Sequence, residues 1–191
     1  MSSIGRRAFA RMFLAFGLVS TAACAGDIPT ENSASPQTAQ PSLSYDPNSF
    51  YVIRNAGSDK VADVSNAGCC NGAWIHQWTY DGSSNQEWSI ISVGSGYYKI
   101  IAKHSGKAMD VESASQYSGA QVHQWTYQNL YNQHWAINDS GSGTVYITAR
   151  HSGKALTVSG TLSNNGSLIK QSTYLGATYM PQQWTIEPAS L

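Results

Sequence analysis

Two sets of polar and aromatic side chains recur at the same spacing in this 191-residue sequence. The sets are Asp63, His76, Trp78 and Asn85 and, 47 residues later, Asp110, His123, Trp125 and Asn132. An exposed indole can stack on the apolar C–H face of a sugar ring. An ionised aspartate accepts charge-assisted hydrogen bonds from neighbouring hydroxyls, and asparagine and histidine supply further donors and acceptors. The two sets are therefore typical of a site that binds sugars.

A third copy of the pattern keeps its framework but has lost the whole set. The equivalent residues are Thr157, Lys170, Ser172 and Pro181. A single aspartate is more often a turn residue, and a single tryptophan in a β protein is usually part of the core. Because the residues are kept together twice and lost together once, we interpret them as one functional unit. The two histidines are equally well explained if they only fix the loop.

The 47-residue period extends over the chain from about residue 50 to residue 187. It yields three repeats, at about 50–96, 97–144 and 145–187, and the third carries two extra residues before Trp184. The positions kept in all three include Ile53, Ile100 and Ile147; Gln77, Gln124 and Gln171; and Trp88, Trp135 and Trp184. The repeated aliphatic residues and closing tryptophans are core candidates. Gln86, Gln133 and Gln182 are expected to satisfy buried backbone groups.

Each repeat consists of short alternating runs separated by Gly, Ser and Asn, which is typical of β structure. Four strands per repeat predict about twelve in all, and one repeat could not bury its own apolar face. The sequence therefore predicts an all-β fold, a β-trefoil with pseudo-threefold symmetry. In the run 74–78, alternation places Trp74, His76 and Trp78 on one face and Ile75 and Gln77 toward the core.

The motif sequence identifies a family. A tripled unit with Asp-Val at 63–64, Gln-Trp-x-Tyr at 77–80 and Asn-Gln-x-Trp at 85–88 resembles the ricin B-chain-type lectins and related carbohydrate-binding modules. The resemblance covers residues 50–187 and implies a β-trefoil that binds sugars in shallow pockets. At matching positions it implies an Asp, a polar residue, a stacking aromatic and an Asn. Tyr80 and Tyr127 follow the tryptophans at alternate positions, so we expect secondary stacking from them.

The N-terminal part predicts export from a bacterial cell. Residues 1–23 combine a basic start, an apolar run and small residues, as in a signal peptide. Cys24 follows Thr-Ala-Ala, which resembles a lipoprotein cleavage box, whereas Ala-Cys-Ala at 23–25 equally suits free secretion. Residues 24–49 are rich in Ser, Thr, Pro, Gln and Asn and are expected to form a disordered tether. A lipid on Cys24 is the one membrane attachment that we expect.

Charge and spacing exclude other functions. Removing residues 1–23 leaves eight basic and eleven acidic residues, so no basic stripe for nucleic acid is expected. A glycosidase needs two carboxylates flanking one bond, but Asp63 and Asp110 belong to different repeats. We therefore expect a monomeric, non-catalytic glycan-binding protein without metal or cofactor. The alternative is a protein-binding trefoil. For Cys69 and Cys70, both a vicinal disulfide and two free thiols remain open.

Overall fold

The computed structural model describes residues 44–189. The predicted export signal, Cys24 and residues 24–43 of the predicted tether lie outside this range. Within it, Tyr45 packs edge-to-face against Tyr51 and Tyr98, with ring centroids 5.3 and 5.6 Å apart. No helix in this part of the chain has the length and apolar character needed to cross a bilayer.

Strands and short 3-10 turns make up the described chain. The strands are β1 (Tyr51–Asn55), β2 (Val61–Val64), β3 (Ile75–Trp78), β4 (Trp88–Gly94), β5 (Tyr97–Ala102), β6 (Ala108–Val111), β7 (Val122–Trp125), β8 (Trp135–Gly141), β9 (Thr144–Ala149), β10 (Ala155–Val158), β11 (Ile169–Ser172) and β12 (Trp184–Pro188). The 3-10 helices are η1 (Ser65–Ala67), η2 (Ser84–Gln86), η3 (Glu112–Ala114), η4 (Tyr131–Gln133) and η5 (Met180–Gln182). The prediction of an all-β chain with four strands per repeat is confirmed.

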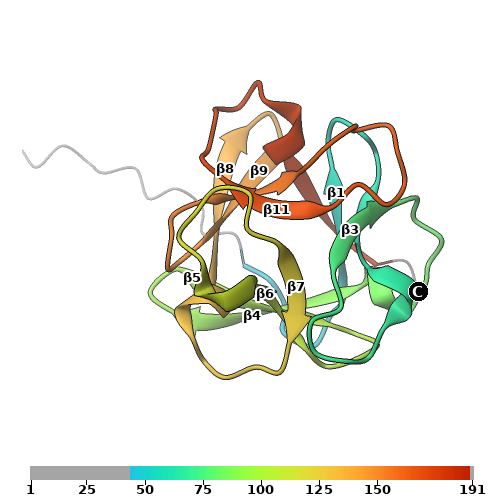
Figure 1. The fold of residues 1–191 in the computed structure, drawn as a ribbon, viewed down its shortest axis with the longest axis vertical. Helices are drawn as coiled ribbons and strands as arrows, with labels where there is room; N and C mark the ends of the chain where they lie inside the picture. Colours follow the sequence, from blue (N-terminus) through green and yellow to red (C-terminus); the bar gives the residue numbers. More distant parts are fainter. Residues whose placement is uncertain (1–43, 190–191) are drawn as a thin grey trace, which may run out of the picture. The chain divides into compact units, whose positions relative to one another are not determined.

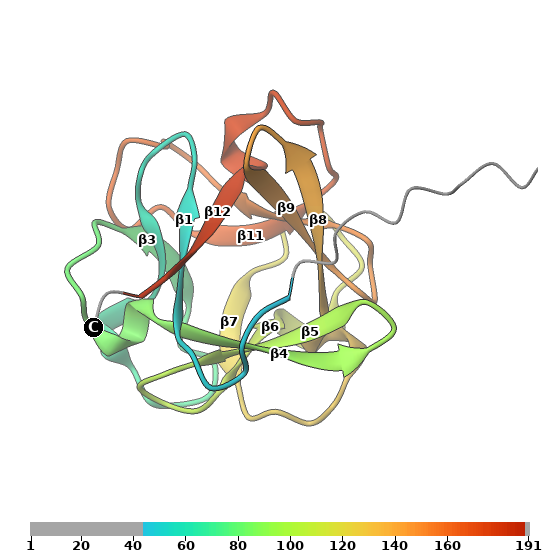
Figure 2. The same ribbon diagram turned by 180° about the vertical axis from the view of Figure 1, so that it is seen from behind.

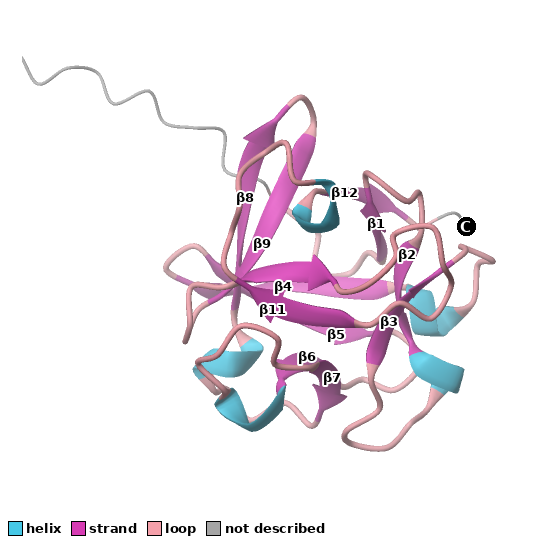
Figure 3. Ribbon diagram, turned by 45° about the horizontal axis from the view of Figure 1, so that its top comes forward, coloured by secondary structure: helices cyan, strands magenta, loops and turns pink. Residues whose placement is uncertain are grey.

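Half of the strands form a closed barrel. Antiparallel pairing runs from β1 to β4, β5, β8, β9 and β12 and returns to β1. The other strands form the hairpins β2–β3, β6–β7 and β10–β11. Figure 1 shows β3, β7 and β11 around the centre of the view, and Figure 2 shows the barrel from behind. The secondary-structure colouring of Figure 3 shows the turns between the strands. This arrangement is the predicted β-trefoil.

The repeated apolar positions fill the barrel, as predicted. The closing tryptophans Trp88, Trp135 and Trp184 are fully buried, together with Ile53, Ile100 and Ile147. The indole N–H groups donate to the carbonyls of Ala62, Met109 and Leu156 at 3.0–3.1 Å. Each large side chain thus adds apolar burial without leaving an unsatisfied polar atom.

The predicted role of the repeated glutamines is also confirmed. Gln86, Gln133 and Gln182 are buried. Each accepts from a backbone N–H and donates to a carbonyl of the loop that precedes it. These loops carry no regular backbone pairing of their own, so the glutamine amides replace it.

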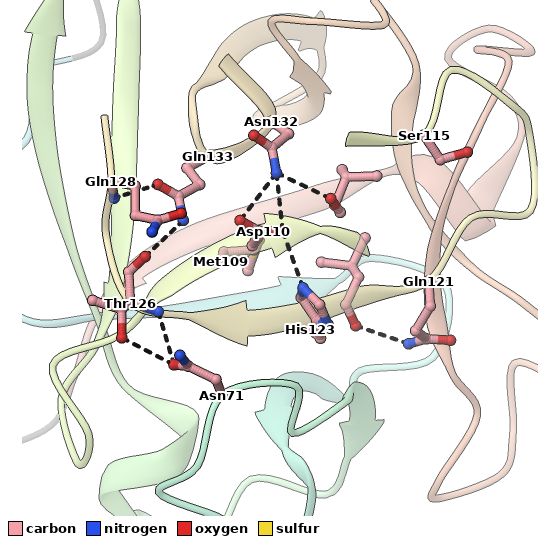
Figure 4. A network of polar contacts seen from close by, with 12 residues as sticks. Asn71, Met109, Asp110, Ser115, Gln121, His123, Thr126, Gln128, Asn132 and Gln133 are labelled. Atoms are coloured by element: carbon pink, nitrogen blue, oxygen red, sulfur yellow. Dashed lines mark hydrogen bonds and ion pairs between the residues drawn. The ribbon is translucent and has the colours of Figure 1, made fainter. Parts of the chain in front are cut away.

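One side chain links the three hairpins where they meet. Isolated bridges pair Trp74 with His123, His76 with Leu168, and Gln121 with Lys170. The Gln121 amide nitrogen lies 2.8 Å from the Val122 carbonyl, 3.1 Å from that of Ile169 and 3.4 Å from that of Ile75. These carbonyls occupy equivalent positions in the three repeats. The buried amide nitrogen of one glutamine therefore lies within hydrogen-bonding distance of a carbonyl in each repeat, and Figure 4 shows one of these contacts.

Replacing Gln121 by leucine, the residue at equivalent position 168, should destabilise the fold. The three carbonyls would lose their shared donor in a buried site, which costs about 1–3 kcal/mol. Urea denaturation followed by tryptophan fluorescence would measure the change in the free energy of unfolding. Leu168→Gln is the matched control and should not reproduce the loss. An unchanged midpoint for Gln121→Leu would show that the amide is dispensable.

Candidate functional site

The first predicted set comes together around Asp63. This aspartate lies on β2 opposite His76 of β3 in the strand register and is 5% exposed. Its Oδ1 is 2.9 Å from His76 Nε2, and its Oδ2 accepts from Gln86 Nε2 at 2.9 Å. The Asn85 amide donates to the Val64 carbonyl at 3.1 Å. The carboxylate is thus held in one orientation by the strand partner and by the loop that ends in η2.

The second set repeats this arrangement on β6 and β7, with one difference. His123 Nε2 lies 3.0 Å from Asp110 Oδ1. The Asn132 amide donates to both oxygens of Asp110 and to the Val111 carbonyl, each at 3.1 Å. Figure 4 shows Asn132, Asp110 and His123 converging. Asparagine therefore contacts the carboxylate here, whereas glutamine does so in the first set.

The two tryptophans of the sets remain accessible. Trp78 is 40% exposed and Trp125 is 36% exposed, in contrast to the buried closing tryptophans. His76 stacks on Trp78 and His123 on Trp125, with ring centroids 5.3 and 5.4 Å apart and planes tilted by 22°. Each histidine thus touches both the aspartate and the indole of its set. It positions both groups relative to each other.

A cavity opens beside each aspartate. The first pocket has a volume of about 260 Å³ and is lined by Asp63, Asn66, Ala67, His76, Trp78, Asp81, Ser83 and Asn85. The second pocket has a volume of about 430 Å³ and is lined by Asp110, Glu112, Ser113, Ala114, His123, Trp125, Gln128, Leu130 and Asn132. All eight residues of the predicted sets are lining residues.

The walls formed by η1 and η3 were not predicted from the sequence. Asn66 and Ser113 adopt the left-handed conformation, each with φ of 55°, and the alanine after each has φ near 48°. Such strained backbone in non-glycine residues is concentrated at functional sites. The third repeat has Gly160 at this position, with φ of 101°. This glycine, in the copy that lost the set, is the sequence signal that could have revealed the wall.

The equivalent place in the third repeat holds a different network. Thr157 is buried, accepts from the Gln182 amide at 3.0 Å and donates to the Ala155 carbonyl at 2.8 Å. A hydroxyl thus satisfies the glutamine that Asp63 satisfies in the first repeat. The framework is complete without a carboxylate, which explains how the fold tolerates the loss.

The first pocket is supported by the third repeat. Gln77, which precedes Trp78, donates to the carbonyls of Leu162 and Asn164. Asn165 Oδ1 accepts from the backbone N–H of Thr79 at 3.0 Å and from its hydroxyl at 3.1 Å. A Cβ on Gly166 would lie 3.8 Å from the Trp78 ring. The loop 162–166 therefore holds the chain on both sides of Trp78.

The second pocket is supported in the same way by the first repeat. Gln124 donates to the carbonyls of Gly68 and Cys70. Asn71 accepts from the Thr126 backbone at 2.9 Å and from its hydroxyl at 3.0 Å (Figure 4). The structure contains Cys69 and Cys70 of this loop as free, exposed thiols. Each pocket is thus lined by its own repeat and supported by a loop of another repeat.

Replacing Asn165 by alanine should weaken the first pocket selectively. The two lost hydrogen bonds, about 1 kcal/mol each, would loosen the chain next to Trp78. We expect about tenfold weaker sugar binding there, the equivalent of about 1.4 kcal/mol. Two-dimensional NMR of the indole N–H signals would follow Trp78 and Trp125 separately during a titration. Asn71→Ala should give the reciprocal result. Equal weakening of both pockets would contradict local support.

Family comparison agrees with this geometry. The family model described as ricin-type beta-trefoil lectin domain-like matches residues 40–125, 84–172 and 131–190. These overlapping matches cover the three repeats. The chain belongs to this family. No sequence among the curated proteins matches the chain.

Several solved structures are similar to this chain. The designed threefold symmetric protein ThreeFoil is 41% identical, with a TM-score of 0.70, over 74% of this chain and 99% of its own. An exo-beta-1,3-galactanase from Clostridium thermocellum is 36% identical, with a TM-score of 0.70, over 76% of this chain but 31% of its own. A Polyporus squamosus lectin, solved with Neu5Aca2-6Galb1-4GlcNAc, shares 18% identity and a TM-score of 0.63 over 76% of this chain and 50% of its own. This last likeness shows the fold alone.

Tyr80 and Tyr127, the predicted secondary stacking residues, lie apart from the pocket linings of this ricin-type trefoil, as does Trp74. Tyr80 contacts the Arg54 guanidinium, 5.7 Å from its ring centroid, and Tyr127 contacts the Lys99 ammonium at 4.6 Å. Trp74 is 52% exposed at the junction of the hairpins. The predicted strand faces are confirmed, because Ile75 and Gln77 are fully buried. Each of the two tyrosines thus contacts a cationic side chain outside the pocket linings.

Proposed function

We propose that the chain is a non-catalytic carbohydrate-binding protein with two competent pockets and a degenerate third copy. Family membership in a lectin-type trefoil supports carbohydrate binding in general. The observation that carries the two-pocket proposal is the pairing of a fixed aspartate with an accessible indole, found beside Asp63 and again beside Asp110. The third copy has Thr157 and Ser172 in these places.

The aspartates retain capacity for a ligand. An ionised carboxylate offers about four acceptor positions. Asp63 uses its two oxygens for one contact each, with His76 and Gln86. The remaining lone pairs can accept from two neighbouring sugar hydroxyls, while Trp78 covers the apolar face of the ring. Two recognition elements of opposite character then act on one sugar, which fixes its orientation.

Each pocket is lined by a second carboxylate, and hydrolysis of a glycosidic bond would require one of the two to act as an acid. Asp81 lines the first pocket and Glu112 the second. A glycosidase needs a general acid whose pKa is raised by its surroundings. Hydrogen bonds from the side chain and backbone of Ser83 instead lower the pKa of Asp81. This carboxyl is unsuited to donate a proton at neutral pH, which favours binding over hydrolysis.

The expected affinity of one pocket is low. An open pocket of this size that contacts one sugar gives a dissociation constant on the order of millimolar, or about −4 kcal/mol. Two pockets on one rigid trefoil would bind a polymeric or clustered glycan more tightly, because the second contact becomes intramolecular. The natural ligand is therefore proposed to be a polysaccharide or a dense glycan surface.

The N-terminal sequence supports a proposal for the cellular setting. We infer export of a monomer through residues 1–23, with either free secretion or a lipid anchor at Cys24. The tether would then place the trefoil away from the membrane. Cell fractionation with radiolabelled fatty acid, comparing the parent with Cys24→Ala, separates these routes. Label in the parent and its loss in the variant would establish the anchor.

A glycan and polysaccharide array probed with the purified chain tests the function. We expect binding to a restricted class of sugars, and calorimetry with the free monosaccharide should give two sites per chain. One site would overturn the two-pocket proposal. Silence on the array, together with capture of a defined protein partner, would favour the protein-binding trefoil.

A further inference from the structure

A cationic and aromatic cluster lies next to the second pocket. It consists of Lys99, Arg150, Tyr97, Tyr127, Tyr131 and His134. The Arg150 guanidinium carbon is 3.9 Å from the ring centroid of Tyr131 and 4.5 Å from that of Tyr97. The Lys99 ammonium is 4.6 Å from the centroid of Tyr127, whose hydroxyl is 3.0 Å from His134 Nε2. Both cations are thus held by aromatic rings.

The cations of this cluster have no acidic partner. Among residues 44–189, the ion pairs involve other side chains, and neither Lys99 nor Arg150 takes part in one. Burial and the charges of Arg150 and Lys99 lower the pKa of His134, so it adds no charge near neutral pH. The cluster therefore carries a charge of about +2 from its lysine and arginine.

The other repeats show that this excess charge is particular to the second. Equivalent backbone hydrogen bonds join Lys103 to Glu87 and Arg150 to His134, at 2.9 and 2.8 Å. Glu87 of the first repeat is buried and forms an ion pair with the Lys103 ammonium of the second. The corresponding pair joins Gln183 of the third repeat to Ala56 of the first and is uncharged. Histidine in place of glutamate thus leaves Arg150 without a counter-charge.

One loop connects the cluster to the second pocket. Leu130 lines the pocket, while its neighbour Tyr131 packs on Arg150. Both are exposed, at 50% and 56%. A glycan that places one sugar against Trp125 and continues over Leu130 would bring the next sugar to Tyr131 and Arg150. Glu112 also lines this pocket, so an acidic group is disfavoured inside and favoured at the cluster.

We propose that Lys99 and Arg150 bind the acidic group, a carboxylate or sulfate, of a glycan whose adjacent sugar occupies the second pocket. The inference rests on the proposed function and adds a ligand class to it. Arg150 suits either anion, because a guanidinium offers paired N–H donors to two oxygens. The first pocket lacks this extension, since its equivalent cation is neutralised by Glu87. The two pockets then differ in preference, one for neutral and one for acidic glycans.

Binding of the full chain to three polymers tests the proposal: a neutral galactan, a sulfated galactan and polygalacturonate. At low ionic strength we expect at least one acidic polymer to bind about tenfold more tightly than the neutral galactan, a difference that salt removes. Comparison of the sulfated galactan with polygalacturonate shows whether the cluster recognises a sulfate or a carboxylate. Equal affinity for all three polymers would overturn the inference.

His134→Glu is the decisive variant, because it installs the acid that the first repeat carries at Glu87. We expect it to abolish the acidic preference and to keep neutral binding. Lys99→Gln with Arg150→Gln should do the same and serves if the first variant fails to fold. Lys154→Gln removes one charge in the third repeat and should retain the preference. Persistence of the preference in both cluster variants would overturn the proposal.

The pocket variant Asp110→Ala shows whether binding at the cluster depends on the second pocket. It should lose binding at the second pocket for neutral and acidic polymers alike. Undiminished binding of the acidic polymer by this variant would show a cluster that acts without the pocket, against the proposal. If the parent binds none of these polymers and no glycan on the array, the proposed function fails and the inference fails with it. If the chain binds the neutral polymer and binds the acidic polymers no more tightly, the carbohydrate-binding proposal stands. Only the proposed role of Lys99 and Arg150 is then refuted.

Discussion

Replacing both Asp63 and Asp110 by alanine should abolish glycan binding in a chain that still folds. Each carboxylate is expected to accept two hydroxyl hydrogen bonds, and bonds to a charged group contribute about 1.5–3 kcal/mol each. A pocket with an affinity of about −4 kcal/mol cannot lose such bonds and remain detectable. The single variants should each halve the number of sites measured by calorimetry.

The same double variant will also lower stability, so a control for folding is needed. Removing Asp63 leaves the buried amide of Gln86 without its carboxylate acceptor. Thr157→Ala removes the equivalent partner of Gln182 in the repeat without a pocket. This control should show a similar loss of stability and no loss of binding. Retained binding by a folded double variant would refute the aspartate-based pockets.

Trp135→Ala should be among the most destabilising single changes in the chain. Trp135 is fully buried, and its indole N–H donates to the Met109 carbonyl at 3.0 Å. Truncating a buried tryptophan to alanine costs about 3–5 kcal/mol. The total stability of a domain is only about 5–15 kcal/mol. We therefore expect a large shift in the urea midpoint and partial unfolding at 37 °C.

Trp125 lies ten residues earlier in the chain. In contrast to Trp135→Ala, the variant Trp125→Ala should lose glycan binding and keep most of its stability. Its indole is 36% exposed, so stability should fall by about 1 kcal/mol or less. Binding at the second pocket should disappear. Circular dichroism during urea denaturation, paired with glycan titration, separates the two effects. A Trp125→Ala variant as unstable as Trp135→Ala would assign both tryptophans to the core.

The internal repeats made it possible to predict the fold and the two sets of pocket residues around Asp63 and Asp110. The 47-residue period gave the repeats, and the alternation along 74–78 gave the faces of β3. Comparing copies then separated framework residues such as Gln86 from the set that includes Asp63. These inferences needed only local pattern and the physical requirement that three repeats share one core.

Contacts between repeats could not be predicted in this way. The amide of Asn165 reaches Thr79 across 86 positions of sequence, and no periodic pattern encodes that partnership. The left-handed backbone at Asn66 and Ser113 was also not predicted, because its sequence signal is Gly160 in the third copy and not the serine itself. The contact of Lys99 from β5 with the ring of Tyr127 is a further long-range contact of this kind, and the stacking of Tyr127 on a sugar stays a prediction. The contacts that hold each pocket in place thus depend on residues far apart in the sequence, which the spacing of the repeats does not reveal.

The support of each pocket by another repeat has a consequence for the order of synthesis. The contacts of Gln124 and Thr126 reach back 54–56 positions, so the ribosome has already produced their partners. Those of Gln77 and Thr79 wait for residues 85–87 positions ahead. The loop that supports the second pocket is therefore made before the pocket, whereas the first pocket gains its support only after residues 162–166 have been made. A circular permutant that starts near residue 97 and joins β12 to β1 would reverse this order, since the third repeat would then precede Trp78.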